Sequence, residues 1–288
     1  ISDLIIKISS EEEKLLNHFS DFCIYESGKK IENNLEVDVF ANKIINIPPG
    51  DIIVNDSFKW MNLKDGSNRK CVYIVINDTI SSSLIVDENW SKAEIYYLLN
   101  GNIWKWKSTL SFFEILFRNC LIHYNGIVIH GSAIEWQKQA IIFTAPSETG
   151  KTTQANLWKK YMGARVLNGD RPAIRIINNQ PTVYGTPWSG SSKEYINKKA
   201  PLMALVLLEQ APVNSIKRLN IFETLNRIMP RFFLPYNDKH LMELATKTIE
   251  AIIKTTPVYL LKCTPDKHAV DILSNVLSTR NNNTNNSE

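Results

Sequence analysis

The stretch Ala145-Pro146-Ser147-Glu148-Thr149-Gly150-Lys151-Thr152 decides the fold of this chain of 288 residues. It ends in Gly-Lys-Thr, follows an apolar run at 140–144 that is typical of a strand, and opens a helical pattern over 151–162. A strand, a loop and a helix in this order are the context of a phosphate-binding P-loop. Backbone N–H groups of the loop and of the helix start would point at the phosphates.

The side chains of this loop have separate predicted roles. Lys151 brings a positive charge to the β and γ phosphates, and the Thr152 hydroxyl ligates Mg²⁺. The first position of the pattern G-x-x-x-x-G-K-[ST] holds Ala145, whose methyl group is tolerated if φ is negative. We therefore predict ATP and Mg²⁺ as cofactors, bound through Ser147, Glu148, Thr149, Gly150, Lys151, Thr152 and Thr153.

Outward from the loop, the chain divides into two parts. Residues 1–107 contain short runs rich in Val, Ile, Tyr and Phe, and 35–40 alternates strictly, as a half-buried strand does. A helix over 108–124 then opens a part in which strands and helices alternate, which is typical of α/β domains. We predict a mixed α/β fold with a smaller, mainly β N-terminal region over 1–107, a P-loop domain over 108–278 and a disordered Asn-rich tail over 279–288.

Composition and charge exclude several classes of protein. Hydrophobic residues make up 44% and charged residues 22%, so the chain can bury a sizeable core. The net charge of +4 is small and spread along the chain, which argues against a nucleic-acid partner. The longest apolar run, 201–208, is too short to span a membrane. Four widely spaced cysteines fit no zinc pattern and indicate a reducing compartment, so we expect a cytoplasmic protein; its oligomeric state is left open.

Short motifs around the loop occur in the order found in a known family. They are Ile129-His130-Gly131, Asn168-Gly169-Asp170-Arg171, Thr186-Pro187-Trp188-Ser189 and Thr264-Pro265-Asp266. Over residues 127–277 the chain resembles the HPr kinase/phosphorylase-like P-loop proteins, and most of all the kinases that modify ribosomal precursor peptides, such as those of lasso-peptide pathways. The resemblance implies a phosphoenolpyruvate-carboxykinase-like P-loop fold. It also implies a phosphotransferase that moves the γ-phosphoryl group of ATP to a Ser or Thr hydroxyl of a peptide or small protein.

Three residues are candidates for catalysis. Asp170 ends a short strand one βα unit after the P-loop, where it either holds Mg²⁺ or accepts the proton of the attacking hydroxyl. The resemblance favours the role of base, with some metal contact. A lone His at a strand end is more often structural, but with the resemblance His130 is expected to face the γ-phosphate. Arg171 is a candidate cation for that phosphate, which the sequence does not rank against Arg218, Arg227 and Arg231.

Two further positions concern ligands. Trp188 and Ser189 lie in a loop bounded by Gly and Pro, where an exposed Trp would anchor a peptide substrate; the alternative is a Trp that closes the edge of the core. Glu209 ends the apolar run and is a candidate partner of a metal ion or an arginine.

Two departures from the family pattern bear on the reaction. Gly169 stands where bifunctional relatives carry a second aspartate, and Glu148 stands where they tend to carry Gly. We therefore predict a kinase with little or no phosphorylase activity. Two other functions stay open: a nucleotide-binding regulatory or scaffold protein with little turnover, and a small-molecule kinase or hydrolase on the same fold.

Overall fold

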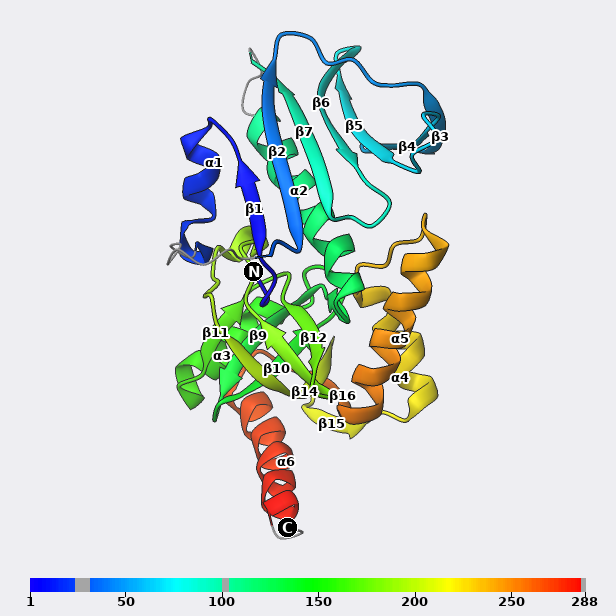
Figure 1. The fold of residues 1–288 in the computed structure, drawn as a ribbon. Helices are drawn as coiled ribbons and strands as arrows, with labels where there is room; N and C mark the ends of the chain where they lie inside the picture. The colour runs from blue at the N-terminus through cyan, green and yellow to red at the C-terminus, as the bar shows by residue number, and fades with distance from the viewer. Residues whose placement is uncertain (24–31, 100–103, 286–288) are drawn as a thin grey trace. The chain divides into compact units, whose positions relative to one another are not determined.

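The computed structural model describes the backbone of residues 1–23, 32–99 and 104–285 (Figure 1). Its contacts divide the chain into two compact units. The first holds residues 1, 3–124 and 235–241, and the second holds residues 2, 125–234 and 242–288. The helix expected over 108–124 therefore belongs to the first unit, so the boundary lies after Tyr124 instead of after residue 107.

The first unit is built on a seven-stranded sheet in the order β1-β2-β7-β6-β5-β4-β3. The pairs β1–β2 and β2–β7 are parallel, and the others are antiparallel. The strands are β1 Ile6–Ser9, β2 Leu35–Asn42, β3 Gly50–Asn55, β4 Lys59–Leu63, β5 Lys70–Ile76, β6 Thr79–Val86 and β7 Lys92–Leu98. The helical elements are α1 Glu13–His18, η1 Ser20–Phe22 and α2 Trp104–His123.

Alternation along β2 decides which face of this sheet is covered. Leu35, Val37 and Val39 are buried, whereas the residues between them are partly exposed, so the half-buried strand predicted over 35–40 is confirmed. The helix α2 contacts β6 and β7, and its side chains Leu116 and Phe117 are fully buried. Figure 1 shows α2 behind β2 and β7, so this helix closes the core of the unit.

The second unit is a nine-stranded mixed sheet that carries the P-loop. Seven strands follow the order β11-β9-β10-β14-β13-β12-β8, while β16 pairs with β14 and β15. The strands are β8 Gly126–Val128, β9 Gly131–Trp136, β10 Gln139–Thr144, β11 Arg165–Asn168, β12 Ala173–Ile177, β13 Gln180–Tyr184, β14 Lys199–Gln210, β15 Ser215–Arg218 and β16 Val258–Cys263. The helical elements are α3 Lys151–Met162, η2 Gly190–Ser192, α4 Ile221–Ile228, η3 Met229–Arg231, α5 Lys239–Thr255 and α6 Lys267–Asn285. Residues 239–241 at the start of α5 are counted with the first unit.

The helix that follows the P-loop is fixed by a large apolar core. α3 contacts β9, β10, β11 and α6. Trp158 on α3 is fully buried, with its ring 5.2 Å from that of Trp136 and 6.1 Å from that of Phe143. Full burial of a side chain such as Phe143 contributes roughly 1.5–3 kcal/mol. Because α3 is held in this way, the loop that precedes it has a firm support.

The predicted mixed α/β fold, with a mainly β region before the P-loop, is confirmed. β10 ends at Thr144, α3 covers Lys151–Met162 as expected, and Gly163 caps its C-terminus with φ 63°. α6 continues to Asn285, inside the tail predicted over 279–288, and residues 286–288 lie outside the described residues. Leu277 on this helix packs in the core.

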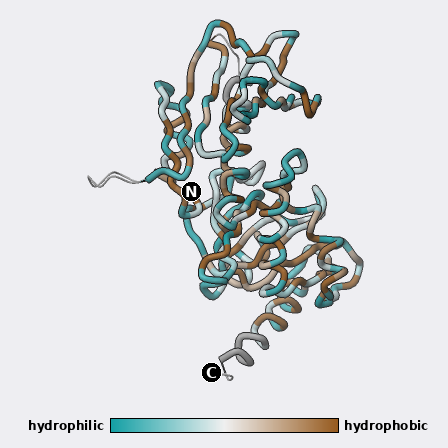
Figure 2. Tube along the Cα trace, turned by 45° about the vertical axis from the view of Figure 1, so that its right-hand side comes forward, coloured by the Kyte–Doolittle hydropathy of each residue, from teal (hydrophilic) through white to brown (hydrophobic). Residues whose placement is uncertain are grey.

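No helix within the described ranges combines the length and the apolar character that a membrane crossing requires. Figure 2 shows hydrophilic and hydrophobic residues mixed along the helices.

Candidate functional site

The P-loop begins in the core and ends in an unusual backbone conformation. Ala145 is fully buried and is not among the residues with positive φ, so its methyl group fits without backbone strain. Glu148 and Gly150 adopt left-handed conformations, with φ 63° and 108°. A Cβ at Gly150 would meet nothing within 4 Å, so glycine is needed there for its φ and not for space.

Lys151, the lysine of the P-loop, folds back on its own loop. Its Nζ donates to the backbone oxygens of Ala145 and Pro146, both at 3.3 Å, and the residue is only 9% exposed. Burial lowers the pKa of the Lys151 ammonium, the charge of Asp170 raises it, and the charge of Arg231 lowers it further. The two long hydrogen bonds leave the ammonium group available to a stronger anionic ligand.

Asp170, which the sequence predicts as the carboxylate of the site, contacts the two other candidate catalytic residues. Its Oδ1 lies 3.2 Å from Nε2 of His130, and its Oδ2 lies 3.1 Å from Nε of Arg171. Burial raises the pKa of Asp170, but the hydrogen bond from His130 and the charges of Arg171 and Lys151 outweigh it, so the pKa is lowered. The structure thus brings the three candidate catalytic residues together, beside the P-loop lysine.

Backbone hydrogen bonds at the strand ends set this arrangement. The N–H of His130 donates to the carbonyl of Arg231 at 2.8 Å, and the N–H of Gly131 donates to the carbonyl of Asp170 at 2.9 Å. The hydroxyl of Thr144, the last residue of β10, donates to the carbonyl of His130 at 2.7 Å. His130 is therefore tied to the P-loop strand, to the Asp170 loop and to η3.

A pocket of about 520 Å³ opens beside the loop. This volume falls in the range of small-molecule and cofactor sites. The residues that line it are Pro146, Ser147, Glu148, Thr149, Leu207, Leu208, Glu209, Gln210, Asn226, Arg227, Arg231 and Leu260.

The structure ranks the arginines that the sequence left unranked. Arg227 and Arg231 line the pocket, whereas Arg171 pairs with Asp170 and lies over the ring of Phe233, 5.8 Å from its centre. Arg218 is exposed on β15 and does not line this pocket. Within the described part of the chain, Nε of Arg231 is buried without a hydrogen-bond partner. Arg227 and Arg231 are therefore the arginines placed to meet an anion in the pocket.

Glu209 takes one of its two expected roles. Its carboxylate lies 2.8 Å from Nζ of Lys262 and 3.5 Å from a guanidinium nitrogen of Arg227. The hydrogen bond from Lys262 is the main cause of the lowered pKa of Glu209. The residue thus pairs with cations on the rim of the pocket and holds Arg227 there.

Of the two predicted positions of Trp188, the structure has the one in which the Trp closes the edge of the core. Trp188 is 8% exposed and Ser189 is 7% exposed, so the exposed Trp that would anchor a peptide is not found. Asn168 fixes the backbone of this loop, because its Nδ2 donates to the carbonyl of Trp188 at 3.2 Å and to that of Thr186 at 2.8 Å. Asn168 and Thr186 were missed by sequence reasoning, because Asn-Gly-Asp signals a turn but not the partner of its amide.

The residues present fit ATP and Mg²⁺. Thr152 is exposed at the start of α3, and Mg²⁺ at P-loops is held by few protein oxygens together with phosphate oxygens and waters. Among the described residues no group of three or more His, Cys, Asp or Glu side chains forms a ready metal cage. The carboxylate of Asp170 already contacts side chains through both oxygens, His130 through Oδ1 and Arg171 through Oδ2. Thr152 is thus a direct candidate ligand, whereas Asp170 would have to exchange a partner.

Position 169 has no room for a second carboxylate. A Cβ on Gly169 would lie 2.7 Å from Cβ of Ser192 and closer still to its Oγ. The N–H of Gly169 also donates to the carbonyl of Glu194 at 2.9 Å, which holds the loop against this segment. Glycine at 169 is therefore a packing requirement of the loop that follows β13.

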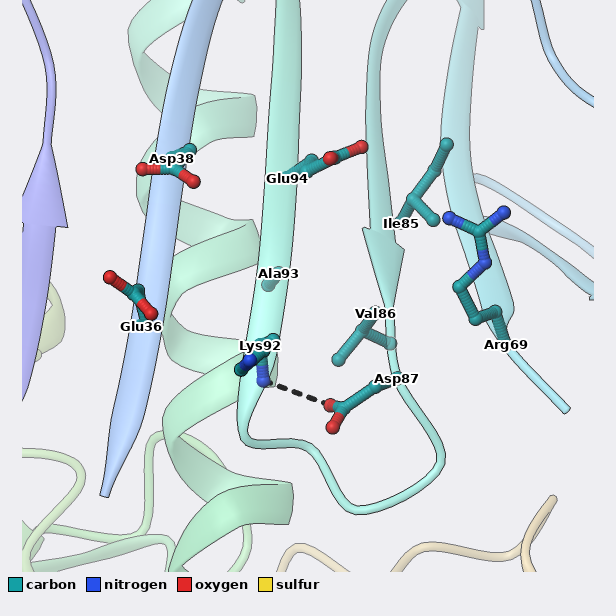
Figure 3. Close-up of a pocket in the computed structure, with 9 residues that line it drawn as sticks. All are labelled: Glu36, Asp38, Arg69, Ile85, Val86, Asp87, Lys92, Ala93 and Glu94. Atoms are coloured by element: carbon teal, nitrogen blue, oxygen red, sulfur yellow. Dashed lines mark hydrogen bonds between the residues drawn. The ribbon is translucent and has the colours of Figure 1, made fainter. Parts of the chain in front are cut away.

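The first unit carries a separate pocket of about 280 Å³ on its sheet (Figure 3). Figure 3 shows four of the lining residues on two neighbouring strands, Glu36 and Asp38 on β2 and Lys92 and Glu94 on β7. Asp87 accepts from the backbone N–H of Lys92 at 2.9 Å. None of the site residues predicted from the sequence lines this pocket.

Comparisons with known proteins assign neither a family nor a function to this chain. No family model matches the chain, and no curated protein matches it. Among solved structures it is similar to the HPr(Ser) kinase/phosphatase from Coxiella burnetii, with a TM-score of 0.31 and 13% identity. That match covers 56% of this chain and 99% of the other. A likeness at this level transfers no residue role to this chain.

Proposed function

We propose that the chain is an ATP-dependent phosphotransferase that modifies a Ser or Thr hydroxyl of a peptide or small protein, expected to be a ribosomal precursor peptide. One observation carries the proposal. The P-loop lysine Lys151 lies within the electrostatic influence of Asp170, whose carboxylate is paired with His130. A phosphate-binding lysine beside an ionised, oriented carboxylate is the minimum that phosphoryl transfer to a hydroxyl requires.

The donor side of the site is the P-loop and its pocket. Bound ATP with Mg²⁺ supplies the phosphoryl group. The backbone of 147–153 and Lys151 would hold its phosphates, and Thr152 would reach the metal ion. Arg231 and Arg227 line the same pocket and would offset negative charge on the phosphates.

The acceptor side is the pair of Asp170 and His130. The lowered pKa keeps Asp170 ionised at neutral pH, so its carboxylate can accept the proton of an approaching hydroxyl. His130 donates a hydrogen bond to Oδ1 and so fixes the orientation of the carboxylate. The guanidinium of Arg171 brings its positive charge to the other oxygen, with Nε 3.1 Å from Oδ2.

A direct assay tests this function. The purified chain is incubated with radiolabelled ATP, Mg²⁺ and the peptide encoded beside its gene, and the Asp170→Asn variant serves as the inactive control. Labelled peptide from the wild type alone supports the proposal. Tight ATP binding without turnover would instead indicate a regulatory protein, and ADP release that does not depend on peptide would indicate a hydrolase or a small-molecule kinase.

A further inference from the structure

A fully buried asparagine joins the two loops that surround Asp170. Asn168 is the last residue of β11 and is 0% exposed. Its Oδ1 accepts from the backbone N–H groups of Asp170 at 2.9 Å and Arg171 at 2.6 Å. Its Nδ2 donates to the carbonyls of Thr186 and Trp188, at 2.8 and 3.2 Å. The amide therefore uses both its accepting and its donating side.

The loop after β13 contacts the same aspartate from the other side. Gly190 has φ 58°, and a Cβ there would lie 2.5 Å from Oδ2 of Asp170. The hydroxyl of Thr186 donates to the carbonyl of Arg171 at 2.7 Å, which adds a second link between the loops. The position of the Asp170 carboxylate therefore depends on the position of this loop, which Asn168 holds.

We propose that Asn168 is a positioning residue for Asp170: its amide fastens the loop over 186–190 to the Asp170 loop and so directs the carboxylate at His130. Asn168 acts through geometry, because it binds the backbone of both loops and contacts no reacting atom. The expected effect of Asn168 on turnover rests on the proposed function, whereas its expected effect on the Asp170–His130 contact does not.

The change Asn168→Leu removes the amide without adding a charge beside Asp170. Leucine has nearly the size of asparagine, but it neither accepts from the N–H groups of Asp170 and Arg171 nor donates to the carbonyls of Thr186 and Trp188, so the two loops separate. Asn275→Leu is the matched control, because Asn275 is exposed on α6.

The first measurement is the titration of the Asp170 carboxyl carbon by NMR, which needs neither substrate nor activity. If Asn168 positions the carboxylate, the pKa of Asp170 rises in Asn168→Leu, since burial then acts without the full hydrogen bond from His130. The second measurement is kinetic: kcat is expected to fall by about 100-fold, as for a misplaced catalytic group, with KM for ATP within about twofold. The control variant leaves the titration and kcat unchanged.

A second variant tests the loop that contacts Asp170 from the other side. Gly190→Ala places a methyl group against Oδ2 of Asp170 and leaves every hydrogen bond of Asn168 intact. Gly163→Ala is its control, because Gly163 has φ 63° and a Cβ there meets nothing within 4 Å. A raised Asp170 pKa in Gly190→Ala, and not in Gly163→Ala, supports the role of the loop.

An unchanged Asp170 titration in folded Asn168→Leu, or in Asn168→Ser if Asn168→Leu does not fold, overturns the inference. A wild-type chain that transfers no phosphoryl group would refute the proposed function alone, because the titration still decides the positioning role.

Discussion

His130 and Asp170 are joined by a contact of 3.2 Å between Nε2 and Oδ1, although 40 residues separate them in the sequence. The contact exists because Gly131 and Asp170 are linked through the backbone. It makes the carboxylate an oriented group instead of a free one. Changes to this pair should therefore impair phosphoryl transfer more than ATP binding, whereas changes to the P-loop lysine should impair both.

Lys151→Ala is expected to abolish nucleotide-dependent activity while the fold stays intact. The ammonium contributes charge at the phosphates and only two long hydrogen bonds to its own loop. Loss of such a group costs about 100-fold or more in rate. Transfer and ATP binding are measured against Lys159→Ala, which removes an exposed lysine of the same helix. Unchanged turnover in Lys151→Ala would show that the loop does not bind the donor.

Asp170→Asn is expected to abolish transfer while only weakening ATP binding, because an amide cannot accept the proton. The same variant reports on stability. The pKa of Asp170 is lowered from 3.8, so the ionised carboxylate stabilises the fold above pH 3.8. This contribution is lost as the pH falls through the lower folded value.

Urea unfolding at pH 7 and below pH 3.8 checks the sign of this effect. Asp170→Asn should be less stable than the wild type at pH 7, and the gap should narrow in acid. Asp271→Asn, an exposed change on α6, is the control. A gap that widens in acid, or a near-normal kcat, would contradict the role of Asp170 and favour His130 as the base.

Gly169→Ala is expected to lower the free energy of unfolding by about 1–3 kcal/mol, because overpacking of a closed site costs that much. The clash is with the side chain of Ser192. Ser192→Gly removes that side chain, so the double variant should recover most of the loss. Two independent, additive effects in this double-mutant cycle would argue that the two positions do not touch.

Phosphorylated product, incubated with the enzyme, Mg²⁺ and millimolar phosphate, is expected to release little or no pyrophosphate. Position 169 cannot carry the second carboxylate, and Glu148 adds negative charge to the wall of the pocket where phosphate must enter. Pyrophosphate release at a rate comparable to the forward reaction would overturn this prediction.

Glu148→Gly is expected to raise the free energy of unfolding by about 0.5–1 kcal/mol. Glycine removes the steric cost of the left-handed conformation at this position, and this gain exceeds the cost of the larger conformational entropy of Gly in the unfolded chain. Glu148→Gln removes the charge and keeps the backbone cost. Both variants should bind ATP more tightly than the wild type, since each removes negative charge near the phosphates. Titration calorimetry and thermal unfolding separate the two effects, and equal ATP affinity in all three proteins would place Glu148 away from the phosphates.

The P-loop was predictable because everything that defines it is local. A strand over 140–144, Gly-Lys-Thr and a helix that stops before Gly163 are contiguous in the sequence, and the structure has them where they were expected. Asp170 and His130 were named as candidates from strand ends and from the resemblance. Their mutual contact depends on the pairing of β9 with β10 and on the backbone link at Gly131.

The features that sequence reasoning missed depend on long-range packing. The amide of Asn168 reaches carbonyls 18 and 20 residues away, so neither its role nor the burial of Trp188 has a local signal. The same holds for the exclusion of side chains at Gly169, which is caused by Ser192. The segment over 235–241 is another case, since no composition change marks it as part of the first unit.

The segment over 235–241 limits where the gene can be cut or recombined without damage to the first unit. The first unit takes residues 235–241 from late in the sequence, and Asp238 pairs there with Lys70 at 2.9 Å between two largely buried side chains. A gene fragment that stops at Tyr124 therefore encodes an incomplete unit, with Lys70 deprived of that carboxylate. A single recombination point between the codons of Lys70 and Asp238 would take these two residues from different parent genes. The N-terminal region and the P-loop region are thus expected to evolve as one inseparable gene segment, not as exchangeable modules.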